Sequence, residues 1–264
     1  MPSEYPNYKI DGTVIKRADY ANISFDNIKT IASNGMQAVF YECTGMTGSI
    51  SFPTLTRIDS YGLNSTFEHC TQITSVLFPE LTIVGSYGMY NAFGYCKKIV
   101  SVSLPKLTTV GDYGLYNVFY VCSGITGAVS FPKLTSIGDH GMIYVLDGCT
   151  NVTSVSFPEL PSIGESGLYR AFDSCTGITS VSFPKLVSIA KKGLGYAFQK
   201  CTNLTSISFP KLTTVGEEGL NYAFSSCTNL TDIHFRSDSR TNITSTAGYG
   251  SKFGASNATI YFDL

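Results

Sequence analysis

The chain has 264 residues, and its 43% apolar content is enough for the core of one or two ordinary domains. With 18 basic and 19 acidic residues, the formal charge of −1 gives no overall field to attract nucleic acid or an anionic membrane, and neither is expected as a partner. No run of about 18 apolar residues predicts a membrane span, and the first residues lack the basic and apolar regions of a signal peptide.

An internal repeat organises most of the chain. It is first recognisable at Ile23–Phe40, where Phe25-Asp26-Asn27-Ile28 stands in the place of a later Phe-Pro-x-Leu. Residues 1–22 precede this degenerate copy and are expected to form an N-terminal cap, because the end of a solenoid needs a polar cover. The repeat then continues to about residue 235.

Cysteine and proline both mark the period of this repeat. Seven of the ten prolines, from Pro53 to Pro210, directly follow a phenylalanine or leucine at the same repeat position. The eight cysteines are Cys43, Cys70, Cys96, Cys122, Cys149, Cys175, Cys201 and Cys227, separated by 27, 26, 26, 27, 26, 26 and 26 residues. A constant period of this length predicts a solenoid of about nine stacked coils over residues 23–235.

Each coil combines two hydrophobic periods. Residues 204–209 begin with an apolar residue, and Ile207 and Phe209 then alternate with Ser206 and Ser208, which predicts a strand with one buried face. Pro210 ends it because proline has no N–H to donate. Leu220, Ala223, Phe224 and Cys227 then recur at i, i+3, i+4 and i+7, the pattern of one face of a short helix. The expected fold is therefore an α/β solenoid of strand–turn–short-helix coils.

Two coils and the C-terminal region depart from the regular unit. An extra residue beside a glycine, in Thr47-Gly48-Ser49 and in Thr126-Gly127-Ala128, predicts a β-bulge in each of these strands. The rhythm fails after Phe235, and residues 236–264 are expected to form a C-terminal cap that includes a closing strand, Thr259 to Phe262.

The consensus AF-x-x-C-T-x-L-T-S-[VI]-x-F-P-x-L-x-x-[IV]-G resembles the BspA-like (Treponema pallidum type) leucine-rich repeat over about residues 23–235. The unit here is longer than is usual in that family, with the extra residues around Gly-Leu-x-x before Ala-Phe. The resemblance implies a bacterial cell-surface or secreted protein, or a related protozoan surface protein, that acts in adhesion and recognition. The family motif supplies no catalytic residue.

The residues that could form a catalytic or metal site are not clustered in this sequence. His69, His140 and His234 occupy three different phases of the repeat, so stacking does not bring them together. The cysteines occur one per coil rather than in close pairs, which argues against a metal site and favours buried thiols over disulfides. No phosphate-binding or dinucleotide-binding motif is present, so no cofactor and no enzymatic activity are expected.

Binding is expected on the outward columns of the solenoid. The strands carry a nearly uniform row of serines, which predicts a solvated sheet face, with carbohydrate or ice binding as alternatives. On the other side, the residue before the coil glycine is aromatic in the first coils, and further tyrosines follow three residues later. We expect these residues to contact the partner, although they could simply cover the solenoid. They are Tyr61, Tyr87, Tyr90, Tyr113, Tyr116, His140 and Tyr169.

Two functions fit these patterns. The first is a non-enzymatic recognition or adhesion module at the cell surface or outside the cell, which binds a protein or glycan partner. The alternative is a structural or receptor-binding protein associated with a phage or prophage tail.

Overall fold

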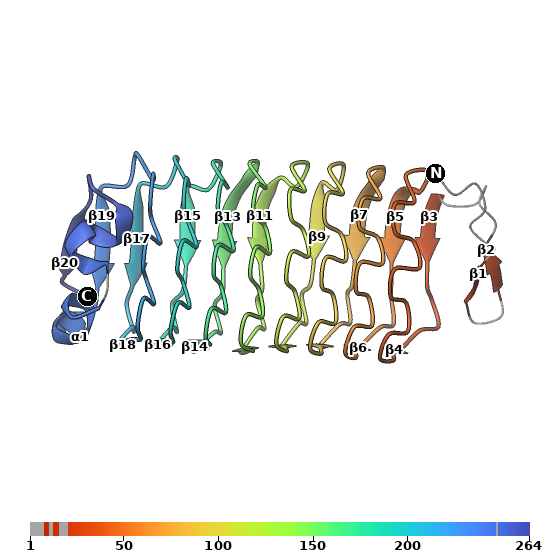
Figure 1. Cartoon of the computed structure of the whole chain (residues 1–264), viewed down its shortest axis with the longest axis horizontal. Coiled ribbons are helices and arrows are strands. Elements are labelled where there is room, and N and C mark those ends of the chain that lie inside the picture. The colour runs from red at the N-terminus through yellow and green to blue at the C-terminus, as the bar shows by residue number, and fades with distance from the viewer. Residues whose placement is uncertain (1–7, 11–12, 16–20, 247) are drawn as a thin grey trace.

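The computed structural model describes residues 8–10, 13–15, 21–246 and 248–264. Its coils lie side by side in a nearly straight row, from the N-terminal coil to a helical cap at the other end (Figure 1). The expected solenoid of about nine coils is confirmed. The expected N-terminal cap, residues 1–22, lies largely outside the described residues; of it, β1 (Tyr8–Ile10) and β2 (Thr13–Ile15) are described and pair antiparallel.

One strand from each coil forms the first face of the solenoid. These strands are all parallel and pair in three groups: β3-β5-β7-β9, β11-β13-β15 and β17-β19-β20. Their bounds are β3 Ala21–Ser24, β5 Thr47–Ser51, β7 Ile73–Leu77, β9 Ser101–Ser103, β11 Gly127–Ser130, β13 Val152–Ser156, β15 Ser180–Ser182, β17 Ser206–Phe209, β19 Asp232–Phe235 and β20 Thr259–Phe262. The closing strand β20 is thus the predicted one.

The two predicted bulges are confirmed. The pairing register shifts between Gly48 and Ser49 in β5, and between Gly127 and Ala128 in β11. Both glycines have φ of +76°, a left-handed conformation that glycine adopts at little cost. The extra residue is therefore absorbed locally, and the coils on either side keep their register.

A second, narrower face was not predicted. Its two-residue strands are also parallel and pair in the groups β4-β6-β8-β10-β12 and β14-β16-β18. Their bounds are β4 Thr30–Ile31, β6 Arg57–Ile58, β8 Ile83–Val84, β10 Thr109–Val110, β12 Ser136–Ile137, β14 Ser162–Ile163, β16 Ser188–Ile189 and β18 Thr214–Val215. Two residues are too few to show an alternating pattern, so the sequence predicts only a turn here.

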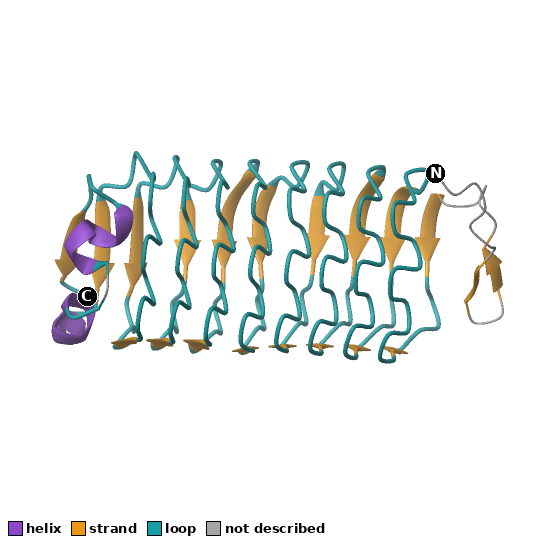
Figure 2. Cartoon of the chain, viewed as in Figure 1, coloured by secondary structure: helices purple, strands orange, loops and turns teal. Residues whose placement is uncertain are grey.

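The predicted short helix of each coil is wrong. Figure 2 shows loops and turns there, and the helices of the described residues all lie in the C-terminal cap. The decisive reason is spacing: strands of a sheet lie about 4.8 Å apart, whereas a helix with its side chains is about 10 Å wide. Helices could not stack in register with two parallel sheets in a straight array.

A ladder of turns replaces the helix, and in the coil that begins at Tyr87 it runs to Cys96. Its amides alternate between two acceptors: Gly88 N–H donates to the carbonyl of Gly85 within the coil (2.9 Å), and Met89 N–H donates to the carbonyl of Gly114 in the next coil (2.8 Å). We call this third side of the solenoid the turn ladder. Its segments are 34–43, 61–70, 87–96, 113–122, 140–149, 166–175, 192–201 and 218–227.

Every fourth residue of the turn ladder has a left-handed backbone. In one coil these are Tyr87, Asn91 and Tyr95, with φ of 56°, 52° and 62°. Such a conformation is costly for residues other than glycine, and hydrogen bonds to the next coil offset the cost. The apolar pattern itself was interpreted correctly, because the residues at the predicted inward positions, Met89 and Phe93, are fully buried.

The core is a set of ladders that run through all coils. Phe52 stacks on Phe78 with ring centroids 5.1 Å apart, and Phe67 stacks on Phe93 at the same separation. Each ladder is made of side chains at the same repeat position in successive coils. The core is therefore shared between coils, and no single coil has a core of its own.

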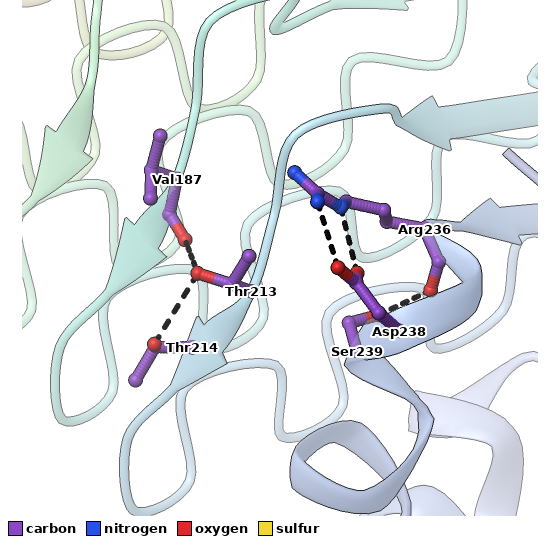
Figure 3. Close-up of polar contacts among 6 residues, drawn as sticks. All are labelled: Val187, Thr213, Thr214, Arg236, Asp238 and Ser239. Carbon is purple, nitrogen blue, oxygen red and sulfur yellow. Dashed lines mark hydrogen bonds and ion pairs between the residues drawn. The ribbon is translucent and has the colours of Figure 1, made fainter.

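The C-terminal cap consists of η2 (Ser237–Ser239), α1 (Arg240–Thr244), η3 (Tyr249–Gly254) and β20. It closes the second face through Asn242, whose Oδ1 accepts a hydrogen bond of 2.6 Å from the N–H of Val215 in β18. At its start, Arg236 forms a paired contact with Asp238, and the Ser239 hydroxyl donates to the Arg236 carbonyl at 2.6 Å (Figure 3). In this way the cap supplies partners to a sheet edge that would otherwise be open.

Candidate functional site

The residues before the coil glycines form a column of stacked rings on the turn ladder. Tyr61, Tyr87, Tyr113 and His140 follow one another with centroid separations of 4.8, 4.8 and 4.7 Å and interplanar angles of 6°, 9° and 5°. All four have a left-handed backbone. The repeat places them in register, and coil spacing sets the distance between the rings.

A second column joins the first. Tyr90 and Tyr116 stack at 4.7 Å, and Tyr90 lies 5.9 Å from Tyr87 within its own coil. Tyr169 occupies the same repeat position, but the intervening coil has buried Ile143 there. Tyr169 consequently packs against Tyr196, at 5.7 Å, and is not joined by ring contacts to the other predicted residues.

Further rings, which the repeat pattern did not predict, extend this surface. Tyr144 contacts both Tyr116 and Tyr120 edge to face, at 5.8 and 6.2 Å, and Tyr95 links Tyr120 to His69. We call the connected set the aromatic face. Its members are Tyr41, Tyr61, His69, Tyr87, Tyr90, Tyr95, Tyr113, Tyr116, Tyr120, His140 and Tyr144. A four-residue spacing in the sequence, as from Tyr87 to Asn91 to Tyr95, could have predicted some of them. A helix does not place residues at this spacing on the surface in the same way as the turn ladder, so the helical interpretation did not include them.

The stacks determine which part of each tyrosine faces a partner. Neighbouring coils cover the ring faces of Tyr87 and Tyr113, so the ring edges and hydroxyls remain available. Among the described residues, none hydrogen bonds to either hydroxyl. Burial and then the adjacent tyrosines raise the pKa of Tyr87, and burial followed by Tyr90 raises that of Tyr116 to about 12. The hydroxyls of Tyr87 and Tyr116 therefore stay protonated and can donate hydrogen bonds.

Charged residues follow the aromatic face along the turn ladder. Asp173 is 4% exposed, and its Oδ2 lies 3.4 Å from Nη1 of Arg170. The Arg170 guanidinium lies over the ring of Tyr196, with its carbon 4.8 Å from the centroid. Burial and, after it, the charge of Asp173 raise the pKa of partly buried Asp147 to about 7. Asp147 belongs to the coil of Tyr144, so it borders the aromatic face.

The serine row on the first face is regular only in part. Ser154 and Ser156 in β13 pair in register with Ser180 and Ser182 in β15, and the Ser156 hydroxyl donates to that of Ser130 at 2.8 Å. The row is interrupted by exposed Leu77, by Ala128 and, towards the cap, by Asp232 and His234. These interruptions favour the interpretation of a solvated sheet face.

A family model for the BspA-type leucine-rich-repeat region matches residues 36–144 and 115–253, with 6 copies of the repeat. The chain belongs to this family. The family assignment agrees with the coil geometry, and a leucine-rich-repeat fold is consistent with a protein-interaction module. None of the curated proteins matches this BspA-type chain in sequence.

Three solved structures are similar to the chain at low sequence identity. A leucine-rich-repeat protein of Treponema pallidum is 19% identical, with 69% of this BspA-type chain and 77% of that chain covered and a TM-score of 0.44. The pneumococcal vaccine antigen PcpA is 12% identical, with coverages of 83% and 62% and a TM-score of 0.34. A leucine-rich-repeat protein from Bacteroides ovatus is 16% identical, with coverages of 90% and 82% and a TM-score of 0.32.

The three histidines of this BspA-type protein lie in different coils, and each contacts a different residue. His69 stacks on Tyr95, His140 stacks on Tyr113, and His234 contacts Asp263 at 2.9 Å next to the cap. In the part of the chain that the structure describes, no group of three or more histidine, cysteine or acidic side chains could hold a metal ion. None of the described helices has the length and apolar character needed to cross a bilayer.

Proposed function

We propose that this BspA-type protein is a non-enzymatic recognition module, at the cell surface or secreted, that binds a protein partner through its aromatic face. The observation that carries this proposal is the connected ring network, from Tyr61 to Tyr144, with Tyr61 37% exposed. Tyrosine combines rigid apolar area with a polar tip, and it is enriched at the energetic centres of protein interfaces.

The stacking geometry favours a protein over a glycan. Sugars pack against open faces of aromatic rings, but in the columns of Tyr87 and Tyr90 these faces contact the next ring. A protein surface can instead pack its apolar side chains on the ring edges and accept hydrogen bonds from the hydroxyls. The partner is therefore expected to bring backbone carbonyls and apolar side chains to this face.

The test is a screen of the immobilised chain against extracellular proteins and a glycan array, followed by variants of the surface. Replacing both Tyr87 and Tyr113 by Ser is expected to abolish the binding found, because it removes the centre of the first column. The matched control replaces Ser154 and Ser180 on the first face by Ala and should bind normally. Circular dichroism and thermal unfolding would show that both variants fold; unchanged binding by the tyrosine variant would reject the proposal.

A further inference from the structure

Two neighbouring coils carry an aspartate at the same repeat position. Asp147 and Asp173 are 26 residues apart, and so are the residues three positions before them, Tyr144 and Arg170. In the second coil Arg170 pairs with Asp173, which also accepts a hydrogen bond from the Ser174 hydroxyl at 3.0 Å. In the first coil Tyr144 takes the place of the arginine. Among the described residues, none forms an ion pair or a side-chain hydrogen bond with the Asp147 carboxylate.

The second coil shows how this surface holds a cation. The guanidinium of Arg170 is close to the Asp173 carboxylate and to two rings, with its carbon 4.8 Å from the centroid of Tyr196 and 5.9 Å from that of Tyr169. A cation gains from the charge of the carboxylate and from the negative face of a tyrosine ring at such distances. Arg170 thus serves as an internal example of the chemistry that a neighbouring coil could offer to an outside group.

The surface around Asp147 holds a carboxylate and two rings, but no described cation forms an ion pair with that carboxylate. The rings of Tyr120 and Tyr144 lie 6.2 Å apart at 76°, and both belong to the aromatic face. Burial is the main cause of the raised pKa of these two tyrosines; the charge of Arg170 opposes the rise at Tyr144, and the charge of Asp147 adds to it at both. The backbone places Asp147 next to both tyrosines, because its N–H donates to the carbonyl of Tyr144 at 3.3 Å and its carbonyl accepts from the N–H of Val121, the neighbour of Tyr120, at 2.8 Å.

We propose that Asp147 and the rings of Tyr120 and Tyr144 bind the guanidinium group of an arginine on the partner. This inference rests on the proposed function, because the arginine belongs to the protein that docks on the aromatic face. The partner's guanidinium takes the place beside Asp147 that Arg170 takes beside Asp173. The partner's arginine would thus supply the ion pair that Asp173 has within the chain and Asp147 does not.

The charges around Asp147 make this binding depend on pH. Burial is the largest effect and opposes ionisation of Asp147, as does the charge of Asp173, whereas the charges of Arg170 and Lys200 favour it. With a pKa of about 7, Asp147 is mostly ionised at pH 8 and mostly protonated at pH 6. A guanidinium needs the ionised form, so binding should be about tenfold weaker at pH 6 than at pH 8.

The probe is N-acetylarginine N-methylamide, added to the full chain with ¹³C-labelled tyrosine and followed by NMR. The resonances of Tyr120 and Tyr144, assigned with Tyr120→Phe and Tyr144→Phe, are expected to shift at pH 8 and much less at pH 6. The corresponding citrulline compound has nearly the same shape but no charge, and should cause no such shift. Equal responses to the two compounds, or responses confined to other tyrosines, would overturn the proposal.

The variant Asp147→Asn keeps the shape of the side chain and removes its charge. It should lose the arginine response at pH 8 and its pH dependence, whereas Asp26→Asn, at an exposed aspartate near the N-terminal end of the solenoid, should respond as the unaltered chain does. An unaltered response of Asp147→Asn contradicts the site. If a partner from the screen is lost by the Tyr87 and Tyr113 variant but kept by Asp147→Asn, this inference fails and the proposed function stands. The reverse pattern rejects the proposed function, and with it the partner's arginine as the occupant of the site, whatever the response to the small arginine probe.

Discussion

The thiol of Cys122 donates a hydrogen bond to the main-chain carbonyl of Phe93, in the preceding coil, with Sγ 3.0 Å from the oxygen. Each of the other six buried cysteines makes the same bond to the coil before it, at 2.9 to 3.3 Å. Burial is the main cause that raises the thiol pKa of Cys122 well above its ordinary value, so the sulfur keeps its proton. Cysteine at this position is thus both a small apolar side chain and a donor between coils.

Replacing Cys122 by Ala should lower the free energy of unfolding by about 1–2 kcal/mol, because it removes the hydrogen bond and leaves a small cavity. Cys122→Ser retains a donor that can reach the Phe93 carbonyl, so a smaller loss is expected. Urea unfolding of both variants measures the difference. A serine variant that is no more stable than the alanine variant would show that the thiol contributes through packing alone.

The left-handed residues of the turn ladder predict opposite effects for one substitution at adjacent positions. Ser226 has φ of 62°, whereas Ser225 is not among the left-handed residues. Ser226→Gly relieves backbone strain and should stabilise the chain by about 0.5 kcal/mol, while Ser225→Gly should destabilise it by about 0.5–1 kcal/mol. Thermal unfolding of the two variants gives the comparison. If this segment were a helix, both substitutions would lower the stability.

The two bulge glycines form another matched pair. A Cβ at Gly127 would meet nothing within 4 Å, so Gly127→Ala should cost only the left-handed backbone strain, about 1 kcal/mol. A Cβ at Gly48 would lie 2.8 Å from Cγ of Asn22 and disturb the hydrogen bond that Asn22 Oδ1 accepts from the N–H of Ser49. Gly48→Ala should therefore cost about 1–2 kcal/mol more in urea unfolding. Equal losses would mean that Asn22 moves away freely.

The raised pKa of Asp147 predicts how stability depends on pH. The folded chain holds this proton up to a pH of about 7, whereas an ordinary aspartate loses it near 3.8, so the contribution of Asp147 to stability falls as pH rises from about 4 to about 7. Asp147→Asn should be more stable than the unaltered chain by about 2 kcal/mol at pH 8, after allowance for solvent screening, and the difference should vanish below about pH 4. Unfolding series at several pH values test this, and a constant difference would contradict it.

Part of the candidate site followed from the sequence. The repeat register alone places Tyr61, Tyr87, Tyr113 and His140 in one column, and their stacking needs only equal coil spacing. The separation of Tyr169 depends on the side chain of Ile143, and the links through Tyr144 depend on the path of the turn ladder. No helical periodicity could have revealed those links. Whether the aromatic face binds a partner stays a prediction.

The sequence by itself determined the period, the inward residues, the two bulges and the closing strand Thr259–Phe262, because each follows from a local pattern of apolar residues, glycine or proline. Only the tertiary structure decided the backbone between Tyr87 and Cys96. There, an apolar pattern that fits a helix also fits turns. Hydrogen bonds to the next coil, at a strand-like spacing of about 4.8 Å that no helix can share, select the turns.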